Sequence, residues 1–202
     1  MKSIDVLPIK IQQAHFNQNE ILKSFIEDKI NNWPLNRITD DIDFPKSLEF
    51  DIVDLPDEFY AFIEDSIEEF LFFQNIRYSK YFISLIWINI HSKKQNKHVF
   101  HVHKNSIFSG VYYYETLKND SLTFFDLDYE FSKYYDFITN DNKDFGQRKT
   151  NVSVKEGDVL FFRSDIMHGV ERFQLNKNER RISISFNINL EGIGSHKRKT
   201  FK

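Results

Sequence analysis

The chain has 202 residues, 41% of them apolar and 16% aromatic, which suffices for one domain with a substantial core and excludes a disordered polypeptide. A net charge of −3 creates no global field for nucleic acid or anionic lipid, and no membrane-length apolar run or secretory signal stands out. We therefore expect a cytoplasmic protein without nucleic-acid or membrane partners. The absence of cysteine excludes disulfides, thiolate metal sites and a cysteine nucleophile.

The first part of the chain, residues 1–76, is predicted to be mainly helical support within a single domain that spans residues 1–202. Apolar residues recur at helical spacing in residues 19–32, with Pro34 just beyond the end of that segment. A second helix is expected to begin near Pro56, because proline in the first turn and acidic residues behind it suit a helix N-terminus. The apolar stripes of both segments are typical of amphipathic packing on a core.

From Tyr81 onward the sequence predicts strands, because short β-branched and aromatic runs alternate with polar turns. The predicted strands are residues 81–91, 99–103, 107–115, 121–128, 150–154, 158–163, 169–173 and 180–190. Eight such strands after a helical start indicate a mainly β fold with helical support. We expect residues 81–190 to form a double-stranded β-helix, a cupin-like jelly-roll core that N-terminal helices precede.

Two further segments are distinguished by composition. Residues 129–149 are long, polar and aromatic, and we interpret them as an insertion loop near the barrel mouth, where loops often determine substrate selectivity. Residues 191–202 end in a basic run, which we expect to be a solvated tail.

The strongest chemical signal is the pair His101 and His103. Side chains alternate between the two faces of a strand, so these two imidazoles are expected to point the same way and to reach one metal ion. Imidazole binds several transition metals, so the pair alone does not name the metal. The alternative is that both histidines simply line a polar strand face. His98 is a third histidine of the same segment, suited either to fixing a neighbouring ligand or to a loop.

His168 follows the predicted buried strand 158–163 and would join the pair if the barrel is wound as expected. Three protein ligands on one face would leave positions open for a chelating cosubstrate and for O₂. Open-sided triads of this kind serve non-haem Fe(II) oxygenases, usually as two histidines and one carboxylate.

Arg181 and Ser183 form a second candidate group, because both face the same side of one predicted strand while Ile182, Ile184 and Phe186 face the packed side. Arginine offers a planar fork for a carboxylate, and a serine hydroxyl can add a further bond. A charge that faces into a barrel needs an anionic partner. That partner is either the distal carboxylate of 2-oxoglutarate or an acidic side chain of the protein itself.

Several blocks of the sequence resemble the 2-oxoglutarate/Fe(II)-dependent oxygenases found in marine bacteria and tailed phages. The matching blocks are Trp-Ile-Asn at 87–89, the histidine cluster at 98–103, Ser-Gly-Val-Tyr-Tyr at 109–113, the strand at 157–162, His168, and Arg-Ile-Ser-Ile-Ser-Phe-Asn at 181–187. The resemblance covers residues 81–190, and its histidine-to-tyrosine block and closing strand are the most specific parts.

The resemblance implies a jelly-roll enzyme that couples oxidative decarboxylation of 2-oxoglutarate to hydroxylation of a small-molecule, amino-acid or peptidyl substrate, with Fe(II), 2-oxoglutarate and O₂ as its requirements. By position it implies that His101, His103 and His168 hold iron, and that Arg181 and Ser183 hold the distal carboxylate. Tyr112 and Asn89 would be further pocket residues that contact the cosubstrate, and His98, Trp87 and Ser109 would surround the site. The sequence departs from the wider superfamily in two places: His103 stands where Asp or Glu is usual, which leaves the iron site more positive, and Asp126-Leu127-Asp128 replaces a usual Asp-Pro.

Two other interpretations remain open. A cupin-type metal dioxygenase or isomerase would also use the three histidines, but its motif normally adds a glutamate where Ile107 and Phe108 stand, and it leaves Arg181 and Ser183 without a role. A non-catalytic β-helix module would bind a partner protein or sugar and would show no turnover.

Overall fold

The structure is a computed structural model that describes residues 10–32, 46–50, 54–125, 149–176 and 179–191. Its order is β1 (Gln12–His15), α1 (Glu20–Asn31), β2 (Lys46–Phe50), α2 (Asp57–Phe73), β3 (Lys80–His91), β4 (His98–His101), β5 (Phe108–Glu115), β6 (Ser121–Phe125), β7 (Lys149–Ser153), β8 (Asp158–Arg163), β9 (His168–Val170) and β10 (Arg181–Glu191). The predicted insertion loop and basic tail lie almost wholly outside the described residues, as does Asp126-Leu127-Asp128.

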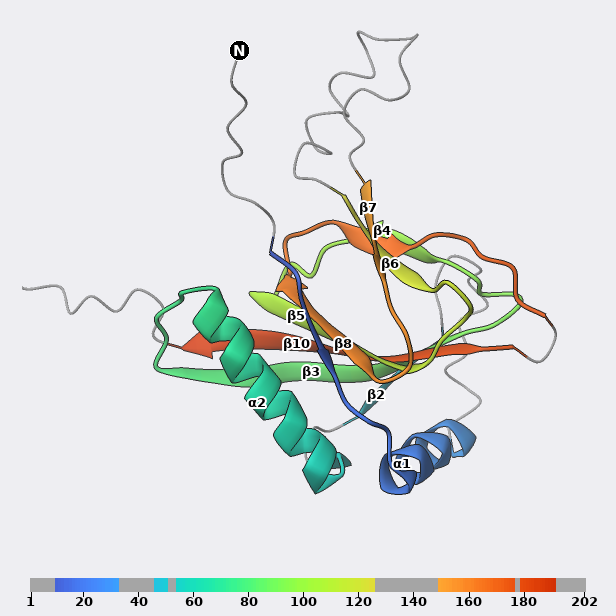
Figure 1. The fold of residues 1–202 in the computed structure, drawn as a ribbon, viewed down its shortest axis with the longest axis horizontal. Coiled ribbons are helices and arrows are strands. Elements are labelled where there is room, and N and C mark those ends of the chain that lie inside the picture. The colour runs from blue at the N-terminus through green and yellow to red at the C-terminus, as the bar shows by residue number, and fades with distance from the viewer. Residues whose placement is uncertain (1–9, 33–45, 51–53, 126–148, 177–178, 192–202) are drawn as a thin grey trace, which may run out of the picture.

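Two antiparallel sheets form the expected double-stranded β-helix. The larger sheet has the order β1-β8-β5-β10-β3-β2 and the smaller has the order β4-β9-β6-β7. Figure 1 shows the two sheets as facing layers, with α1 and α2 both on the outer side of the larger sheet. The expectation of a mainly β fold with helical support is therefore confirmed, since the helices cover one sheet and leave the space between the sheets to other side chains.

Both predicted helices are present and begin where their caps place them. The side chain of Asn19 accepts a hydrogen bond from the Leu22 amide at 2.9 Å at the start of α1. Pro56 stands as the N-cap of α2, followed by Asp57 and Glu58 in the first turn. The helices bury apolar side chains against the larger sheet, and each fully buried large aliphatic or aromatic side chain contributes about 1.5–3 kcal/mol.

Eight of the strands correspond to the predicted ones, with small differences at their ends. The predicted strand 99–103 ends at His101, so His103 lies beyond it, and the predicted strand 169–173 begins at His168 and ends at Val170. Residues 1–76 also hold two strands that the sequence analysis does not predict. These are β1, which pairs with β8, and β2, which pairs with β3 at the edge of the larger sheet.

Strand β10 divides the interior into two environments. Ile182, Ile184, Phe186 and Ile188 belong to the apolar cluster beneath the helices. The alternate residues Arg181, Ser183 and Ser185 are also buried, although they are polar. By alternation they lie on the opposite face of the strand, toward the smaller sheet. A second apolar cluster, which includes Val111, Leu122, Phe162 and Val170, fills part of the space between the sheets, and the functional residues lie beside it.

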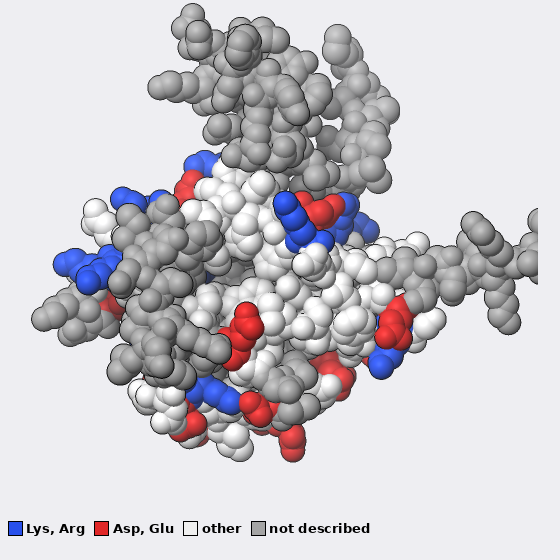
Figure 2. Space-filling model, turned by 180° about the vertical axis from the view of Figure 1, so that it is seen from behind, with Lys and Arg blue, Asp and Glu red and all other residues white. Residues whose placement is uncertain are grey.

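The surface carries charges of both signs. In Figure 2 the described acidic and basic residues are interspersed around a largely uncharged centre of that face. Neither described helix is both long enough and apolar enough to cross a membrane.

Candidate functional site

Three histidines converge between the two sheets. One ring nitrogen from each of His101, His103 and His168 lies within 4.8 Å of the corresponding atoms of the other two, and the Nε2 atoms of His101 and His103 are 3.1 Å apart. Within the described residues, these three are the group that could hold a metal ion. Because their side chains belong to segments up to 67 positions apart in sequence (101 to 168), the barrel topology creates the cluster.

The strands position the histidines in two ways. His101 and His168 are direct partners across the β4–β9 ladder, which places their rings side by side with centroids 4.6 Å apart. His103 follows the end of β4, and its backbone N–H donates to the carbonyl of Ser164 at 2.9 Å. The predicted grouping of the three residues therefore rests on a paired strand and a tethered loop, and strand alternation explains only part of it.

The Nδ1 atom of each histidine faces an oxygen acceptor. His101 faces the carbonyl of Val99 at 2.9 Å, His168 faces the carbonyl of Ile166 at 2.8 Å, and His103 faces the Oδ1 atom of Asn187 at 2.6 Å. In each case Nδ1 can donate only as N–H, which fixes the tautomer and leaves the Nε2 lone pair for a metal. This arrangement fits a transition-metal ion held by three neutral imidazoles.

Burial also keeps these imidazoles uncharged. It lowers the pKa of His101 and of His103, and it lowers the pKa of His168 well below the ordinary histidine value. Burial, followed by the nearby His101, lowers the pKa of His98 to about 3. Neutral imidazole is the form that binds metals, so protons do not compete for these nitrogens near neutral pH.

Arg181 lies at the start of β10, is only 1% exposed and lines the same pocket as the three histidines. Its Nε donates to both carboxylate oxygens of Asp120, at 3.0 and 2.7 Å, and its guanidinium carbon lies 5.1 Å from the ring centroid of Tyr113. Its Nη2 atom is buried without a hydrogen-bond partner among the described residues. Asp120 is therefore the acidic partner of the Arg181 Nε atom, and the described residues do not use the Nη2 donor.

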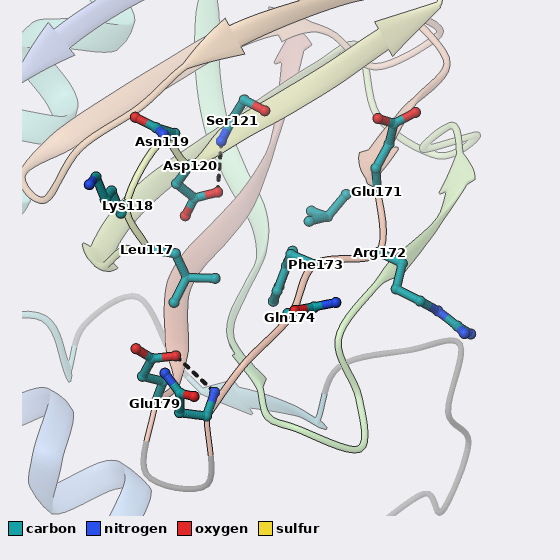
Figure 3. A pocket seen from close by; sticks show the side chains of 12 residues that line it. Leu117, Lys118, Asn119, Asp120, Ser121, Glu171, Arg172, Phe173, Gln174 and Glu179 are labelled. Carbon is teal, nitrogen blue, oxygen red and sulfur yellow. Dashed lines mark hydrogen bonds between the residues drawn. The ribbon is translucent and has the colours of Figure 1, made fainter.

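A hydrogen bond from the next residue in the chain holds Asp120 in place. Its Oδ1 accepts a hydrogen bond from the Ser121 amide at 2.7 Å, and this bond is drawn in Figure 3. Asp120 borders a separate cavity of about 450 Å³, which is lined by residues 117–121 and 170–174 and by Asn176 and Glu179. Figure 3 shows these side chains. None of the converging histidines lines that larger cavity, so we assign the chemistry to the histidine pocket.

The histidine pocket is tight. It is lined by Trp87, Asn89, His91, His98, His101, His103, Val111, Leu122, His168, Gly169, Val170, Arg181, Ser183 and Ser185. Its cavity volume is about 30 Å³, so the lining side chains lie close around the space between the histidines and Arg181.

The other predicted residues are distributed around this pocket. Asn89 and Ser183 are strand partners that both line it, and Asn89 is hydrogen-bonded to Trp87, Ser47 and Ser185. Trp87 stacks on His103 with ring centroids 5.6 Å apart. His98 stacks on His101 at 4.6 Å.

Ser109 and Tyr112 do not line the pocket. The Ser109 hydroxyl lies 2.7 Å from that of Ser164 and donates to Asn187 at 3.3 Å, so it supports the residue that holds His103. The ring of Tyr112 packs against Phe59 of α2 at 4.6 Å, in the cluster beneath the helices.

Sequence reasoning missed three residues of the site: His91, Asp120 and Tyr113. His91 could have been found from the alternation of Trp87, Asn89 and His91 along β3, which places all three on one face. Asp120 carries no such signal, because its pairing with Arg181 joins residues 61 positions apart.

The comparisons with known proteins agree with this geometry. A family model described as "Putative 2OG-Fe(II) oxygenase" matches residues 85–187, which include every histidine of the cluster and Arg181. None of the curated protein sequences matches the chain at a significant level.

Solved structures share the fold at low sequence identity. A viral collagen prolyl hydroxylase from Paramecium Bursaria Chlorella virus-1 in complex with 2OG is 13% identical, has a TM-score of 0.55 and covers 88% of this chain and 94% of its own. A prolyl-4-hydroxylase from Pseudomonas putida is 13% identical, with a TM-score of 0.53 and coverage of 91% and 94%. HygX from Streptomyces hygroscopicus, with nickel and 2-oxoglutarate bound, is 12% identical, with a TM-score of 0.56 and coverage of 90% and 83%.

Proposed function

Because the chain belongs to the 2OG-Fe(II) oxygenase family, whose members require Fe(II) and 2-oxoglutarate, we propose that it is a hydroxylase. In the proposed reaction 2-oxoglutarate, O₂ and a substrate C–H group give succinate, CO₂ and a substrate C–OH group. One oxygen atom enters the new carboxylate of succinate and the other enters the hydroxyl group. The bonds that break are the O–O bond, the substrate C–H bond and the bond between the keto carbon and the departing carboxylate.

The observation that carries the proposal is the coexistence of two unused polar groups in one buried pocket. Three imidazoles each bring one ring nitrogen within 4.8 Å of the other two, and Arg181 in the same pocket has an Nη2 atom without a hydrogen-bond partner in the described part of the chain. A metal suits the first group and a carboxylate suits the second. A molecule that bears a keto acid at one end and a carboxylate at the other would bridge them.

In this proposal each residue has a defined task. His101, His103 and His168 hold Fe(II), which when bound supplies the oxygen chemistry. Arg181 and Ser183 hold the distal carboxylate and so orient the cosubstrate, which replaces a bimolecular encounter with a fixed geometry. The apolar residues Val111, Leu122 and Val170 line the same pocket and limit the access of water.

The proposed substrate class is a small molecule or an amino-acid or peptidyl side chain. Two of the proteins with similar structures are described as prolyl hydroxylases, one of them a collagen prolyl hydroxylase, which supports peptidyl proline as the first class to test. The residues that line the pocket are assigned to metal and cosubstrate, so the proposed substrate approaches from outside it.

The cupin-type interpretation is less well supported, because it gives Arg181 no role although this charged residue lines the pocket. The non-catalytic interpretation likewise leaves the buried Nη2 atom without a purpose. Dependence of O₂ consumption on 2-oxoglutarate separates the first interpretation from ours, and metal retention without turnover would identify the second.

The test is an anaerobic titration of the apoprotein with Fe(II) and then with 2-oxoglutarate, followed by visible absorption. We expect a weak band that requires both additions and is lost in His168→Ala and in His101→Ala. His15→Ala is the matched control, because His15 lies on β1 with its side chain 40% exposed and outside the pocket. Binding of Fe(II) without any response to 2-oxoglutarate would contradict the proposal.

A further inference from the structure

His91, the last residue of β3, is 1% exposed, yet neither of its ring nitrogens makes a hydrogen bond of normal geometry with a described residue. Buried polar side chains nearly always have a partner, so an orphaned imidazole points to a missing ligand. His91 also lines the pocket that holds the three converging histidines and Arg181.

The location of His91 relates it to Arg181 rather than to the metal group. His91 and Arg181 are direct partners across the β3–β10 ladder, and directly opposed side chains on one face have Cβ atoms only about 5 Å apart. Its ring also lies 6.1 Å from that of His98 and 5.7 Å from that of Phe173. The grouping of metal-ligand candidates does not include it.

His91 and Arg181 each have nitrogen atoms that could bind the same ligand. Arg181 already donates its Nε to Asp120, whereas its Nη2 atom and both ring nitrogens of His91 make no hydrogen bond of normal geometry with the described residues. Burial, and then the neighbouring charge of Arg181, lowers the pKa of His91 well below the ordinary value. The ring is therefore neutral, with one N–H to donate, and it adds no charge beside the guanidinium.

We propose that His91 binds the distal carboxylate of the cosubstrate together with the Nη2 atom of Arg181, and so makes the protein select a dicarboxylate over a monocarboxylate 2-oxo acid. This inference rests on the proposed function. The two donors come from neighbouring strands, so they can address the two oxygens of one carboxylate from different sides. Removal of His91 leaves one oxygen of that group without its partner in a buried site.

The test compares two ligands that differ only at the distal end. Dissociation constants of 2-oxoglutarate and of 2-oxopentanoate are measured by calorimetry on Mn(II)-loaded protein, which needs no turnover. The preference for 2-oxoglutarate is expected to fall about tenfold or more in His91→Phe, because a hydrogen bond to a charged group is lost. His91→Gln, which keeps an N–H donor, is expected to retain most of the preference. His15→Phe, a matched substitution outside the pocket, should leave it unchanged.

The ratio of the two constants separates binding at the distal end from general damage to the pocket, which would weaken both ligands alike. An unchanged ratio in His91→Phe, with tight 2-oxoglutarate binding to the wild type, overturns the role of His91 and leaves the proposed function intact. Absence of 2-oxoglutarate binding to the metal-loaded wild type overturns both.

A second measurement serves if His91→Phe does not fold. In Zn(II)-loaded protein with ¹⁵N-labelled histidine, 2-oxoglutarate should shift the ring N–H signal of His91 downfield, and 2-oxopentanoate should not. The signal is assigned by its loss in His91→Gln. Equal shifts with the two ligands would contradict the proposal.

Discussion

Arg181 and Asp120 form an ion pair inside the barrel that engages the Nε atom of the guanidinium but not its Nη2 atom. The Nε atom donates to both carboxylate oxygens, whereas Nη2 has no partner among the described residues. Both side chains are almost fully buried, at 1% and 3% exposure. The sequence is compatible with two partners for Arg181, a protein carboxylate or a ligand carboxylate, and the guanidinium has donors for both.

Loss of the buried carboxylate should destabilise the protein. Asp120→Asn leaves the charge of Arg181 uncompensated, and removing one partner of a buried pair costs about 3–5 kcal/mol. The free energy of unfolding, from urea denaturation without added metal or ligand, measures the effect. Asp165→Asn is the control, because Asp165 pairs with Arg163 on the surface, where such pairs contribute about 1 kcal/mol or less. Similar losses in the two variants would contradict the prediction.

Removal of both members of the pair should separate folding from cosubstrate binding. In Asp120→Leu/Arg181→Met no buried charge is left unpaired, so the stability is expected to stay close to the wild type. The affinity for 2-oxoglutarate should fall by about 100-fold, since charge-assisted hydrogen bonds are lost. Thermal unfolding and calorimetry on Mn(II)-loaded protein measure the two quantities.

The single variant Arg180→Met is the control for this double change. Arg180 is adjacent in sequence but pairs with Glu115 and Glu27 outside the pocket. It should leave 2-oxoglutarate affinity within about twofold of the wild type, because surface charge changes have small effects at a buried site. A large loss of affinity here would show that the charge of this strand end matters more than the position of the guanidinium.

Asn187 should control the affinity for the metal through His103. Its Oδ1 accepts from the Nδ1 of that ring at 2.6 Å, and loss of such an outer partner typically lowers metal affinity about 10–100-fold. We expect this loss in Asn187→Leu, measured by competition with a metal chelator. Asn189→Leu is the matched control, because Asn189 lies on the same strand but bonds Ser84 and Asn105 rather than a histidine. Equal losses in the two variants would exclude the specific role.

Gly169 should limit the spacing between β4 and β9. A Cβ atom at this position would lie 2.8 Å from the backbone oxygen of His98 and 2.7 Å from the ring of Phe100, and the backbone oxygen cannot move freely. Gly169→Ala is therefore expected to separate the strands that carry His101 and His168, and overpacking of this kind costs about 1–3 kcal/mol. Unfolding and chelator competition should both show a decrease; unchanged metal affinity would mean that the strand spacing is not critical.

Much of the barrel could be predicted because polar and apolar residues alternate along its strands and so distinguish the two faces of the sheet. In β10 the alternation of Arg181, Ser183 and Ser185 with isoleucine and phenylalanine correctly predicts which residues face the helices and which face the interior. The two strands that escaped prediction are short and polar in character. Strand β1 has the sequence Gln-Gln-Ala-His, and β2 is an edge strand, so tertiary pairing rather than local pattern determines them.

The sequence predicts those site residues whose type suggests their chemistry. It does not predict residues that only the fold brings into contact with them. Histidines and an inward arginine are rare enough to be selected from sequence, and the structure brings them into one pocket. Asp120 is one of 30 acidic residues, and its contact with Arg181 depends on how a turn before β6 meets the start of β10. Tyr112 and Tyr113 differ by a single position, and strand alternation sends the first to the helices and the second to the arginine.

The metal group contains three uncharged imidazoles, and the only charged side chain that lines the pocket, among the described residues, is already balanced by Asp120. The protein side of the site is therefore electrically neutral. A dication that enters alone leaves two uncompensated positive charges in a region that water hardly reaches, and a dianion alone leaves two negative ones. Each is the counter-ion of the other, so their binding is thermodynamically linked: whichever binds first raises the affinity for the second, by the same factor in either order.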